Sequence, residues 1–251
     1  MRLAGLQKLT LLDFPGEVAC TVFTKGCNLR CPFCQNPGLV LPELLSEEGT
    51  LSEEEFFSFL ERRKGRLSAV TVTGGEPTVH PDLPAFLSSI QKMGYLVKLD
   101  TNGLNPEMLS RILDAKLADY VAMDVKNSPG KYALTCGIKE HAAQKEEPVP
   151  GLWEQAKKSI ALLRESPVKG EFRTTVVSGL HTIEDIRQTA RFLAGLRPWF
   201  LQQFREGVEG GSLVGTFQHS GLHLSSPSWK DLDEMKTAVQ DLVPNTEIRG
   251  I

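Results

Sequence analysis

The sequence predicts an α/β fold of a single domain, residues 1–251, built as a partial, open (β/α)6 barrel. Two observations predict this fold. Stretches of strand character alternate six times with stretches of helical periodicity, which is the order that produces a parallel sheet. Polar motifs directly follow several of the strands, and ligand sites in parallel α/β folds gather at the carboxyl ends of strands. Six units are two short of a closed eightfold barrel, so we expect an open one.

The expected strands are rich in β-branched and apolar residues, and most end at a turn signal or a polar motif. Residues 1–16 are expected to end in the turn Leu12-Asp13-Phe14-Pro15-Gly16, and no strand is assigned to them. The core barrel strands lie within residues 17–204 and are 17–23, 69–73, 95–99, 120–123, 171–177 and 199–204.

Helices are expected between these strands, and several of them carry start signals. Ser52 with Glu55, and Thr182 with Asp185, have the spacing of a capping box, and Pro106 stands in a first turn, where proline is tolerated. The expected helices are 52–60, 82–93, 106–116, 153–164, 182–193 and 228–242.

Two segments do not fit the alternation of strands and helices. Residues 127–150 lack a clear period and are expected to form an exposed, irregular excursion with room for a short helix. Residues 205–251 are expected to form a C-terminal loop and helix, with a short edge strand at residues 247–248.

The composition is that of an ordinary globular protein. A formal net charge of −3 and a pI near 6.0 give no reason to expect nucleic-acid binding by bulk charge. No apolar run approaches the roughly 18 residues of a membrane span, and the apolar patch at residues 9–12 is too short for a signal peptide. We expect a cytoplasmic protein with no membrane or nucleic-acid partner, in which clustered cysteines bind metal.

The densest chemical motif is C-x3-C-x2-C, formed by Cys27, Cys31 and Cys34. Three thiolates on one loop can hold three irons of a [4Fe–4S] cluster, which normally takes four cysteines, and leave one iron open to a substrate or cofactor. A structural zinc site would need a fourth ligand. Cys20 could supply it, although Cys20 lies in an expected strand. Cys136 stands alone in the sequence and is expected to be inert.

Three further polar motifs follow expected strands. The stretch Gly74-Gly75-Glu76-Pro77 lies between a strand and a helix, where glycines let the backbone approach a ligand and free its N–H groups for bonding. The stretches Asp100-Thr101-Asn102-Gly103 and Asp124-Val125-Lys126 close the third and fourth strands. Each could be ordinary turn chemistry alone, but together at one edge of a sheet they predict a ligand site.

The cysteine motif with Phe33 before its third cysteine, followed by the Gly-Gly-Glu-Pro stretch, resembles the radical S-adenosylmethionine (SAM) enzymes. The resemblance implies the radical SAM form of the partial (β/α)6 barrel, with Cys27, Cys31 and Cys34 as metal ligands. It implies two cofactors, a [4Fe–4S] cluster and SAM, and reductive cleavage of SAM to a 5′-deoxyadenosyl radical. In such enzymes the cofactor carries the hard chemistry, and the protein positions it.

The resemblance also implies which residues contact SAM. The expected contacts lie on the cysteine loop, in the Gly-Gly-Glu-Pro stretch and at the ends of later strands, and they are Phe33, Gln35, Asn36, Gly74, Gly75, Glu76, Thr101, Asp124, Val125, Lys126 and Gln203. Phe33 and Gln35 match positions at the adenine, although many relatives have His in place of Gln35. Arg173 is expected at the same mouth, either as a contact or as a structural ion-pair partner. No catalytic residue is expected beyond the cluster and SAM ligands.

Residues 5–16 and 23–34 are similar to the anaerobic ribonucleoside-triphosphate reductase activating proteins, which are glycyl-radical-enzyme activating enzymes. The similarity implies that a hydrogen atom is taken from a glycine of a partner glycyl radical enzyme, anaerobic ribonucleotide reductase, with flavodoxin or ferredoxin as the electron donor. The lack of a second cysteine cluster favours this interpretation. The alternatives are a radical SAM enzyme that acts on a small molecule, such as a deazapurine synthase, and a non-catalytic iron–sulfur or zinc protein that carries electrons or serves as a scaffold.

Overall fold

The computed structural model describes residues 1–40, 51–138, 151–195, 197–206 and 223–250. Its strands form one eight-stranded sheet in chain order, in which β1 pairs antiparallel with β2 and all later neighbours pair in parallel. The strands are β1 Leu3–Thr10, β2 Ala19–Thr24, β3 Ala69–Gly74, β4 Leu96–Thr101, β5 Tyr120–Asp124, β6 Lys169–Val176, β7 Trp199–Gln203 and β8 Thr246–Arg249.

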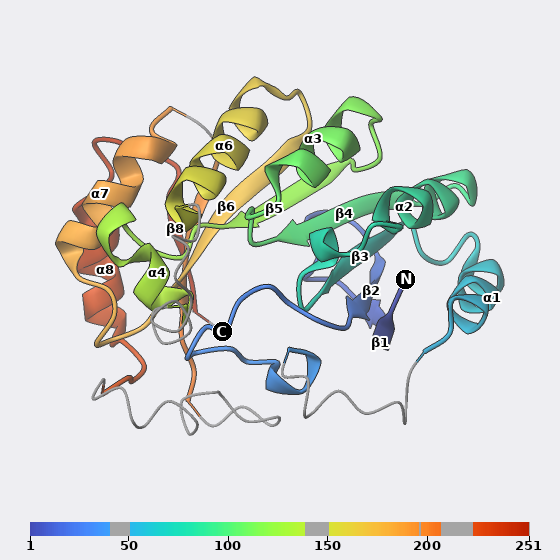
Figure 1. The fold of residues 1–251 in the computed structure, drawn as a ribbon, viewed down its shortest axis with the longest axis horizontal. Coiled ribbons are helices and arrows are strands. Elements are labelled where there is room, and N and C mark those ends of the chain that lie inside the picture. Colours follow the sequence, from blue (N-terminus) through green and yellow to red (C-terminus); the bar gives the residue numbers. More distant parts are fainter. Residues whose placement is uncertain (41–50, 139–150, 196, 207–222, 251) are drawn as a thin grey trace, which may run out of the picture.

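In the described part of the chain, each strand from β2 to β7 is followed by a helix of at least nine residues. The helices are α1 Glu53–Arg63, α2 Leu83–Lys92, α3 Pro106–Asp114, α6 Leu152–Glu165, α7 Ile183–Leu193 and α8 Trp229–Thr237. They lie around the outside of the curved sheet (Figure 1), and β1 and β8 do not pair with each other in the described part of the chain. The partial (β/α)6 barrel is therefore confirmed. No helix among the described residues has the length and apolar character needed to cross a membrane.

Local start signals agree with the structure. Ser52 and Thr182 accept hydrogen bonds from the backbone N–H groups of Glu55 and Asp185, whose carboxylates bond back to the cap residues, so both capping boxes form. Ser228 caps α8 in the same way. This helix ends at Thr237, earlier than expected, and turns follow it.

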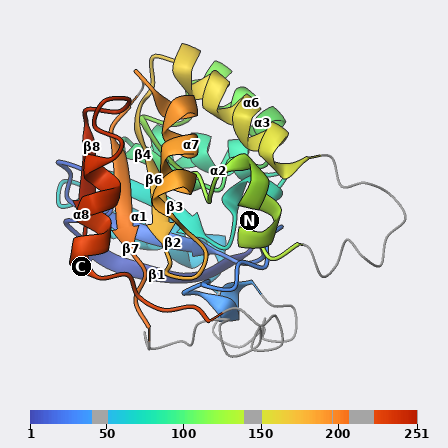
Figure 2. The ribbon, with the colours of Figure 1, turned by 90° about the vertical axis from the view of Figure 1, so that its left-hand side faces the viewer.

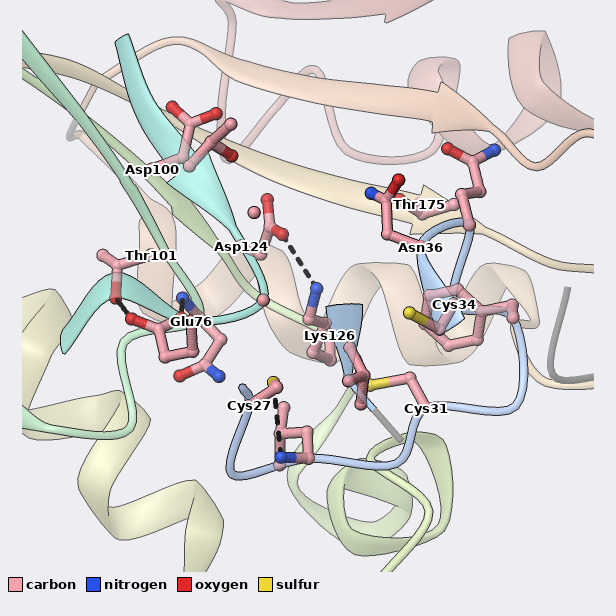
Figure 3. Close-up of a pocket in the computed structure, with 18 of the residues that line it drawn as sticks. Cys27, Cys31, Cys34, Asn36, Glu76, Asp100, Thr101, Asp124, Lys126 and Thr175 are labelled. Carbon is pink, nitrogen blue, oxygen red and sulfur yellow. Dashed lines mark hydrogen bonds and ion pairs between the residues drawn. The ribbon is translucent and has the colours of Figure 1, made fainter. Parts of the chain in front are cut away.

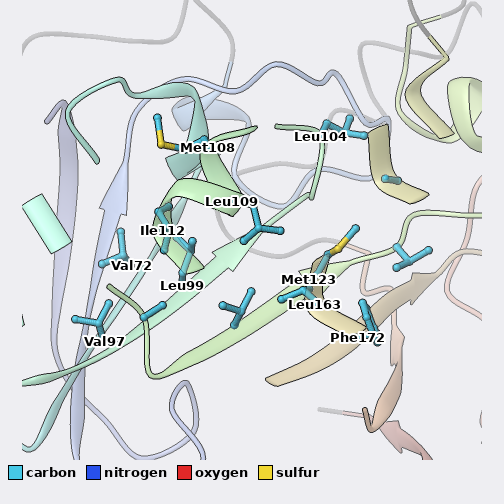
Figure 4. Close-up of a cluster of buried hydrophobic side chains, with 14 of the residues drawn as sticks. Val72, Val97, Leu99, Leu104, Met108, Leu109, Ile112, Met123, Leu163 and Phe172 are labelled. Atoms are coloured by element: carbon cyan, nitrogen blue, oxygen red, sulfur yellow. The ribbon is translucent and has the colours of Figure 1, made fainter. Parts of the chain in front are cut away.

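Side-chain alternation gives the sheet a helix-facing side and an inner side. On β5, Val121 and Met123 face the helices and belong to the hydrophobic core, whereas Asp124 faces the inside of the barrel. Helix α3 packs Leu109 and Ile112 onto this core (Figure 4). Full burial of each such side chain contributes about 1.5–3 kcal/mol, so the helix-facing side stabilises the barrel and leaves its inner side for polar groups.

The structure departs from expectation at two places. Residues 3–10 form strand β1 at the edge of the sheet, far from α3 and α6 (Figure 2), although no strand was predicted there. The segment after β5 is not an exposed excursion over its described part: Asn127, Tyr132 and Cys136 are almost fully buried. It does hold the short helix α4, Tyr132–Thr135. Residues 139–150, and most of the expected loop at 205–226, lie outside the described residues.

Candidate functional site

A cavity of about 280 Å³ opens at the carboxyl ends of the strands, near the lower end of the volumes typical of small-molecule sites (Figure 3). It lies between the loop that follows β2 and the ends of β3 to β7. Its lining residues are Cys27, Leu29, Cys31, Phe33, Cys34, Gln35, Asn36, Val40, Thr73, Gly74, Gly75, Glu76, Asp100, Thr101, Asn102, Asp124, Lys126, Arg173, Thr175 and Gln202.

The cysteine loop borders this cavity with three free thiols. Its own hydrogen bonds shape the loop: the N–H of Leu29 donates to Cys27 Sγ at 3.4 Å, and the N–H of Cys34 donates to the carbonyl of Cys31 at 3.0 Å. The Arg30 guanidinium donates to the carbonyls of Cys27 and Leu29 at 2.9 and 2.7 Å. Burial raises the pKa of Cys27 to about 12 and also raises the pKa of Cys34. Metal binding would therefore have to displace protons from these thiols.

Gly74, the last residue of β3, and Gly75 bring this strand end against the start of the cysteine loop. The N–H of Gly75 donates to the carbonyl of Thr24 at 2.9 Å, and the N–H of Glu76 donates to the carbonyl of Gly26 at 2.8 Å. A Cβ on Gly75 would lie 2.0 Å from the Gly26 oxygen, a distance that no side chain tolerates. The sequence suggested that N–H groups of this stretch would be free to bond a ligand, but the N–H groups of Gly75 and Glu76 are both paired within the backbone. The glycines instead allow close packing of two backbones beside Cys27.

The Glu76 carboxylate fastens the end of β3 to the end of β4. It accepts hydrogen bonds from the N–H and hydroxyl of Thr78, from Thr101 Oγ1 at 2.7 Å and from the Asn102 N–H at 2.6 Å. The side chain is only 1% exposed, and this burial raises its pKa against the effect of the hydrogen bonds. Glu76 and Thr101 are therefore positioned by one shared network at the cavity wall.

A row of alternating charges crosses the inner side of β4, β5 and β6. Arg173 donates from Nε to Asp124 at 2.9 Å and from Nη1 to Asp100 at 3.2 Å, and Lys126 Nζ lies 2.8 Å from Asp124. Lys98 pairs with Asp100. Figure 3 shows that Lys126 stands between Asp124 and the cysteine loop.

These neighbours keep the carboxylates and the lysine charged. Burial opposes ionisation of Asp124, but Arg173 and Lys126 outweigh it and hold the pKa of Asp124 well below its ordinary value. Asp100 is shifted in the same direction, since Arg173 and Lys98 outweigh its burial. Burial likewise opposes the charge of Lys126, and Asp124 nevertheless raises the pKa of that ammonium.

The structure brings most of the expected contact residues to the cavity. Phe33, Gln35, Asn36, Gly74, Gly75, Glu76, Thr101, Asp124 and Lys126 line it together with the three cysteines. Arg173 also lines the cavity and is at the same time an ion-pair partner of Asp100 and Asp124.

Val125 and Gln203, which were also expected at the site, are not among the residues that line the cavity. Val125 is fully buried on the helix-facing side, as alternation after Asp124 requires. Gln203 shares a face with the core residue Leu201, and its amide donates to the carbonyl of Pro227 at 2.7 Å. Gln202 lines the cavity in its place.

Two of the lining residues that were not predicted could have been identified from the alternation of side chains along a strand. Thr175 follows Arg173 by two positions on β6, and Gln202 has the opposite parity to Leu201 on β7. Once one residue of a strand is assigned to the inner or outer side, a period of two assigns the others.

The two remaining cysteines lie in different environments. Cys20 is fully buried on the helix-facing side of β2 with Val22, away from the cavity, so it cannot complete a zinc site with the loop. Cys136 is fully buried beside the cysteine loop, where its carbonyl accepts a hydrogen bond from the N–H of Arg30 at 3.1 Å. Interaction with the Cys136 thiol lowers the pKa of Cys31. No three His, Cys, Asp or Glu side chains among the described residues converge as a single-ion site does.

Comparison with known proteins identifies the family. The Radical SAM superfamily matches residues 21–193. The chain belongs to the radical SAM superfamily. The matched part begins in β2 and ends with α7, so it includes the cysteine loop and the ends of β3 to β6. Membership implies a [4Fe–4S] cluster and SAM, and three free thiols beside a polar cavity fit these groups in donor chemistry.

Relatives within the radical SAM superfamily differ in how much of the chain they match. An inferred glycyl-radical enzyme activating enzyme of Methanocaldococcus jannaschii is 28% identical over 249 residues, which are 99% of this chain and 95% of that protein. The pyruvate formate-lyase-activating enzyme of Clostridium pasteurianum is 31% identical over 131 residues, 50% of this chain and 52% of that one. A 7-carboxy-7-deazaguanine synthase of Methanopyrus kandleri is 33% identical over 130 residues, 45% of this chain and 51% of that one.

Solved structures share the radical SAM fold at low identity. The crystal structure of SuiB from Streptococcus suis, bound to the precursor peptide SuiA, has a TM-score of 0.60 and 14% identity over 92% of this chain and 48% of its own. The structure of anSMEcpe with bound AdoMet has a TM-score of 0.57 and 15% identity, over 90% of this chain and 61% of its own. At these identities the likeness concerns the fold alone.

Proposed function

We propose that this radical SAM enzyme is a glycyl-radical-enzyme activating enzyme whose partner is anaerobic ribonucleoside-triphosphate reductase. One observation carries the proposal: the match to the inferred activating enzyme of M. jannaschii extends over 99% of this chain, whereas the match to the deazaguanine synthase of M. kandleri covers 45%. The match to the M. jannaschii protein therefore includes the strand ends, the cysteine loop and both edges of the sheet. A protein substrate also suits the open barrel, in which β1 and β8 do not pair among the described residues.

In this proposal Cys27, Cys31 and Cys34 hold a [4Fe–4S] cluster, which together with SAM supplies a 5′-deoxyadenosyl radical when both are bound. The cysteine loop sets the cluster at the cavity, because the close packing of Gly75 on Gly26 fixes the backbone just before the first ligand. Flavodoxin or ferredoxin would provide the electron.

Different residues of the cavity would hold the methionyl group and the adenine of SAM. The ammonium of Lys126 suits a carboxylate, and the network of Glu76 and Thr101 offers oxygen atoms to an ammonium group. Phe33, packed edge-on against Phe204 at 6.4 Å between ring centroids, offers an apolar wall for an adenine, with Gln35 and Asn36 beside it.

The test begins with anaerobic reconstitution, reduction and addition of SAM, followed by chromatography for 5′-deoxyadenosine. We expect formation in the wild type, none after Cys27→Ser, Cys31→Ser or Cys34→Ser, and wild-type formation after Cys20→Ala. A loaded wild-type cluster that leaves SAM intact would refute the assignment. Incubation with anaerobic ribonucleotide reductase should then give a glycyl radical signal by electron paramagnetic resonance.

A second candidate reaction is deazaguanine synthesis, because several 7-carboxy-7-deazaguanine synthases match parts of the chain at 32–38% identity. This candidate predicts 7-carboxy-7-deazaguanine as a product, detectable by mass spectrometry, and no radical on a protein partner. The two reactions are thus separated by where the adenosyl radical takes its hydrogen atom.

A further inference from the structure

The buried ring of His181 joins the loop after β6 to the end of β5, and the proposed reaction does not use it. His181 is 6% exposed and lies just before α7. Its Nε2 is 2.8 Å from the carbonyl oxygen of Lys126, a residue 55 positions earlier in the chain. Its Nδ1 is 3.1 Å from the backbone nitrogen of Val177. One imidazole therefore bridges two backbone segments that belong to different strand–helix units.

These two contacts assign the tautomer of the ring. A carbonyl oxygen can only accept, so Nε2 carries the hydrogen that bonds to Lys126. Nδ1 of the neutral ring then accepts from the N–H of Val177. The Val177 carbonyl lies 3.3 Å from the same nitrogen, but it already accepts from the N–H groups of Leu180 and His181. Burial lowers the pKa of His181 and so favours this neutral form.

The segment after β5 is held at the same corner by the first turn of α7. Asp185, which is only 6% exposed, accepts from Ser128 Oγ at 2.9 Å and from Lys131 Nζ at 2.6 Å. The same carboxylate belongs to the capping box of α7. His181 and Asp185 thus hold residues 126–131 together, at a point where the ladder of β5 has already ended.

The turn that carries His181 has partners of its own. Gly179 has φ +93°, and a Cβ there would lie 2.3 Å from the carbonyl oxygen of His223, so this turn needs glycine. The backbones of Ser178 and Ser225 exchange two hydrogen bonds, at 3.0 and 3.2 Å. The imidazole is therefore presented to the end of β5 from a fixed backbone.

The side chain of Lys126 enters the cavity from this held segment. Its Nζ is 2.8 Å from Asp124, and the side chain is 14% exposed (Figure 3). The N–H of Lys126 is 3.5 Å from the Tyr132 hydroxyl, a distance beyond the usual range of a hydrogen bond. The bond from His181 at 2.8 Å is thus the stronger of these two contacts to the Lys126 main chain.

We infer that His181 is a positioning residue for Lys126, because its bond to the Lys126 carbonyl holds the ammonium where it binds the carboxylate of SAM. The inference rests on the proposed role of Lys126 as the partner of that carboxylate. A side chain that contacts a ligand keeps its productive geometry only when supporting residues fix it. One hydrogen bond is enough to change an affinity by about fivefold, so loss of this bond should weaken SAM binding by about that factor.

The experiment compares His181→Asn with His181→Gln in the cluster-loaded protein. The Gln amide reaches the position of Nε2 and can still donate to Lys126, whereas the shorter Asn amide reaches only the position of Nδ1. The readouts are the dissociation constant of SAM, from equilibrium dialysis without a reductant, and amide hydrogen exchange of residues 124–128 by mass spectrometry. We expect His181→Asn to bind SAM about fivefold more weakly and to exchange faster in this segment, and His181→Gln to stay within about twofold of the wild type in both.

Two further variants separate this role from a general loss of stability. Thr189→Val removes a buried hydroxyl that donates to the Asp185 carbonyl within α7, and it should leave the affinity for SAM unchanged. Lys126→Met removes the ammonium itself. If His181 acts through Lys126, then His181→Asn should cause no further loss of affinity in the Lys126→Met background.

Three outcomes would overturn the inference. Wild-type affinity in His181→Asn would show that the bond does not act on SAM binding. An equal loss of affinity in His181→Gln would assign the effect to the ring itself, and it decides the question even if His181→Asn does not fold. Additive losses in the double variant would show that His181 acts by a route other than Lys126. A loaded wild type that does not bind SAM would instead refute the proposed function, so the two failures are distinguishable.

Discussion

Replacing Arg173 by Met should destabilise the barrel through the two carboxylates that the guanidinium joins. The side chains of Arg173, Asp100 and Asp124 are 15%, 13% and 27% exposed, so their ion pairs at 3.2 and 2.9 Å are largely shielded from water. Removing one partner of a buried pair costs about 3–5 kcal/mol. Lys98 and Lys126 remain beside the carboxylates, so we expect a loss near the lower end, about 3 kcal/mol at pH 7.

The loss should depend on pH in a defined direction. The folded-state pKa values of Asp100 and Asp124 are lowered, so their contribution to stability is complete above the unfolded-state value near 3.8 and disappears as the pH falls through the folded-state values. The difference between wild type and Arg173→Met should therefore be full at neutral pH and shrink below about pH 4.

Urea denaturation of the cluster-free proteins at about pH 7 and about pH 3.5 measures this difference. Lys64→Met is the control, since the exposed pair of Lys64 with Glu61 should contribute less than about 1 kcal/mol at either pH. Equal losses for Arg173→Met at both pH values would refute the electrostatic reasoning, and a loss below about 1 kcal/mol at pH 7 would refute the assigned burial cost.

Two other substitutions test the backbone contact and a buried imidazole. Gly75→Ala should lower the free energy of unfolding by about 1–3 kcal/mol and reduce iron loading, because its Cβ meets the Gly26 oxygen. The control Gly130→Ala has open space around its Cβ and should change the free energy of unfolding by less than about 0.5 kcal/mol. Denaturation and iron analysis compare the two variants, and equal effects would contradict the contact. The His181 ring is hydrogen-bonded to the backbone of Val177 and Lys126, and burial lowers its pKa, so the stability of the wild type should fall as the pH drops below about 6.5. His181→Asn should flatten this slope in denaturation series between about pH 5 and 8. An unchanged slope would show that His181 does not cause it.

Sequence patterns were sufficient where the information is local. The capping boxes at Ser52 and Thr182 are formed within four residues, and strand β3 is recognisable from its β-branched run. Most of the site could be predicted for a related reason: parallel strands bring their carboxyl ends to one edge, so motifs that end β3, β4 and β5 meet without any knowledge of packing.

What could not be predicted depends on contacts between distant segments. Strand β1 has a burial pattern without regular alternation, and it forms because its backbone pairs with β2. The hydrogen bond from the N–H of Arg30 to the carbonyl of Cys136 likewise requires α4 to fold back onto the cysteine loop. The position of Gln202 in the cavity wall, by contrast, could have been predicted from the sequence, because Leu201 is a core residue and neighbouring residues of a strand face opposite sides.

The order of strands in the sheet bears on the timing of cluster assembly during protein synthesis. Each strand from β2 onward lies next to the one made before it, so strand–helix units can dock one after another as the chain leaves the ribosome. The cysteine loop emerges early, but Lys126 and Arg173, which line the same cavity, arrive much later. The cavity beside the three thiols therefore lacks part of its wall until β6 has been made. We therefore expect iron to be delivered to the finished protein rather than to the nascent chain.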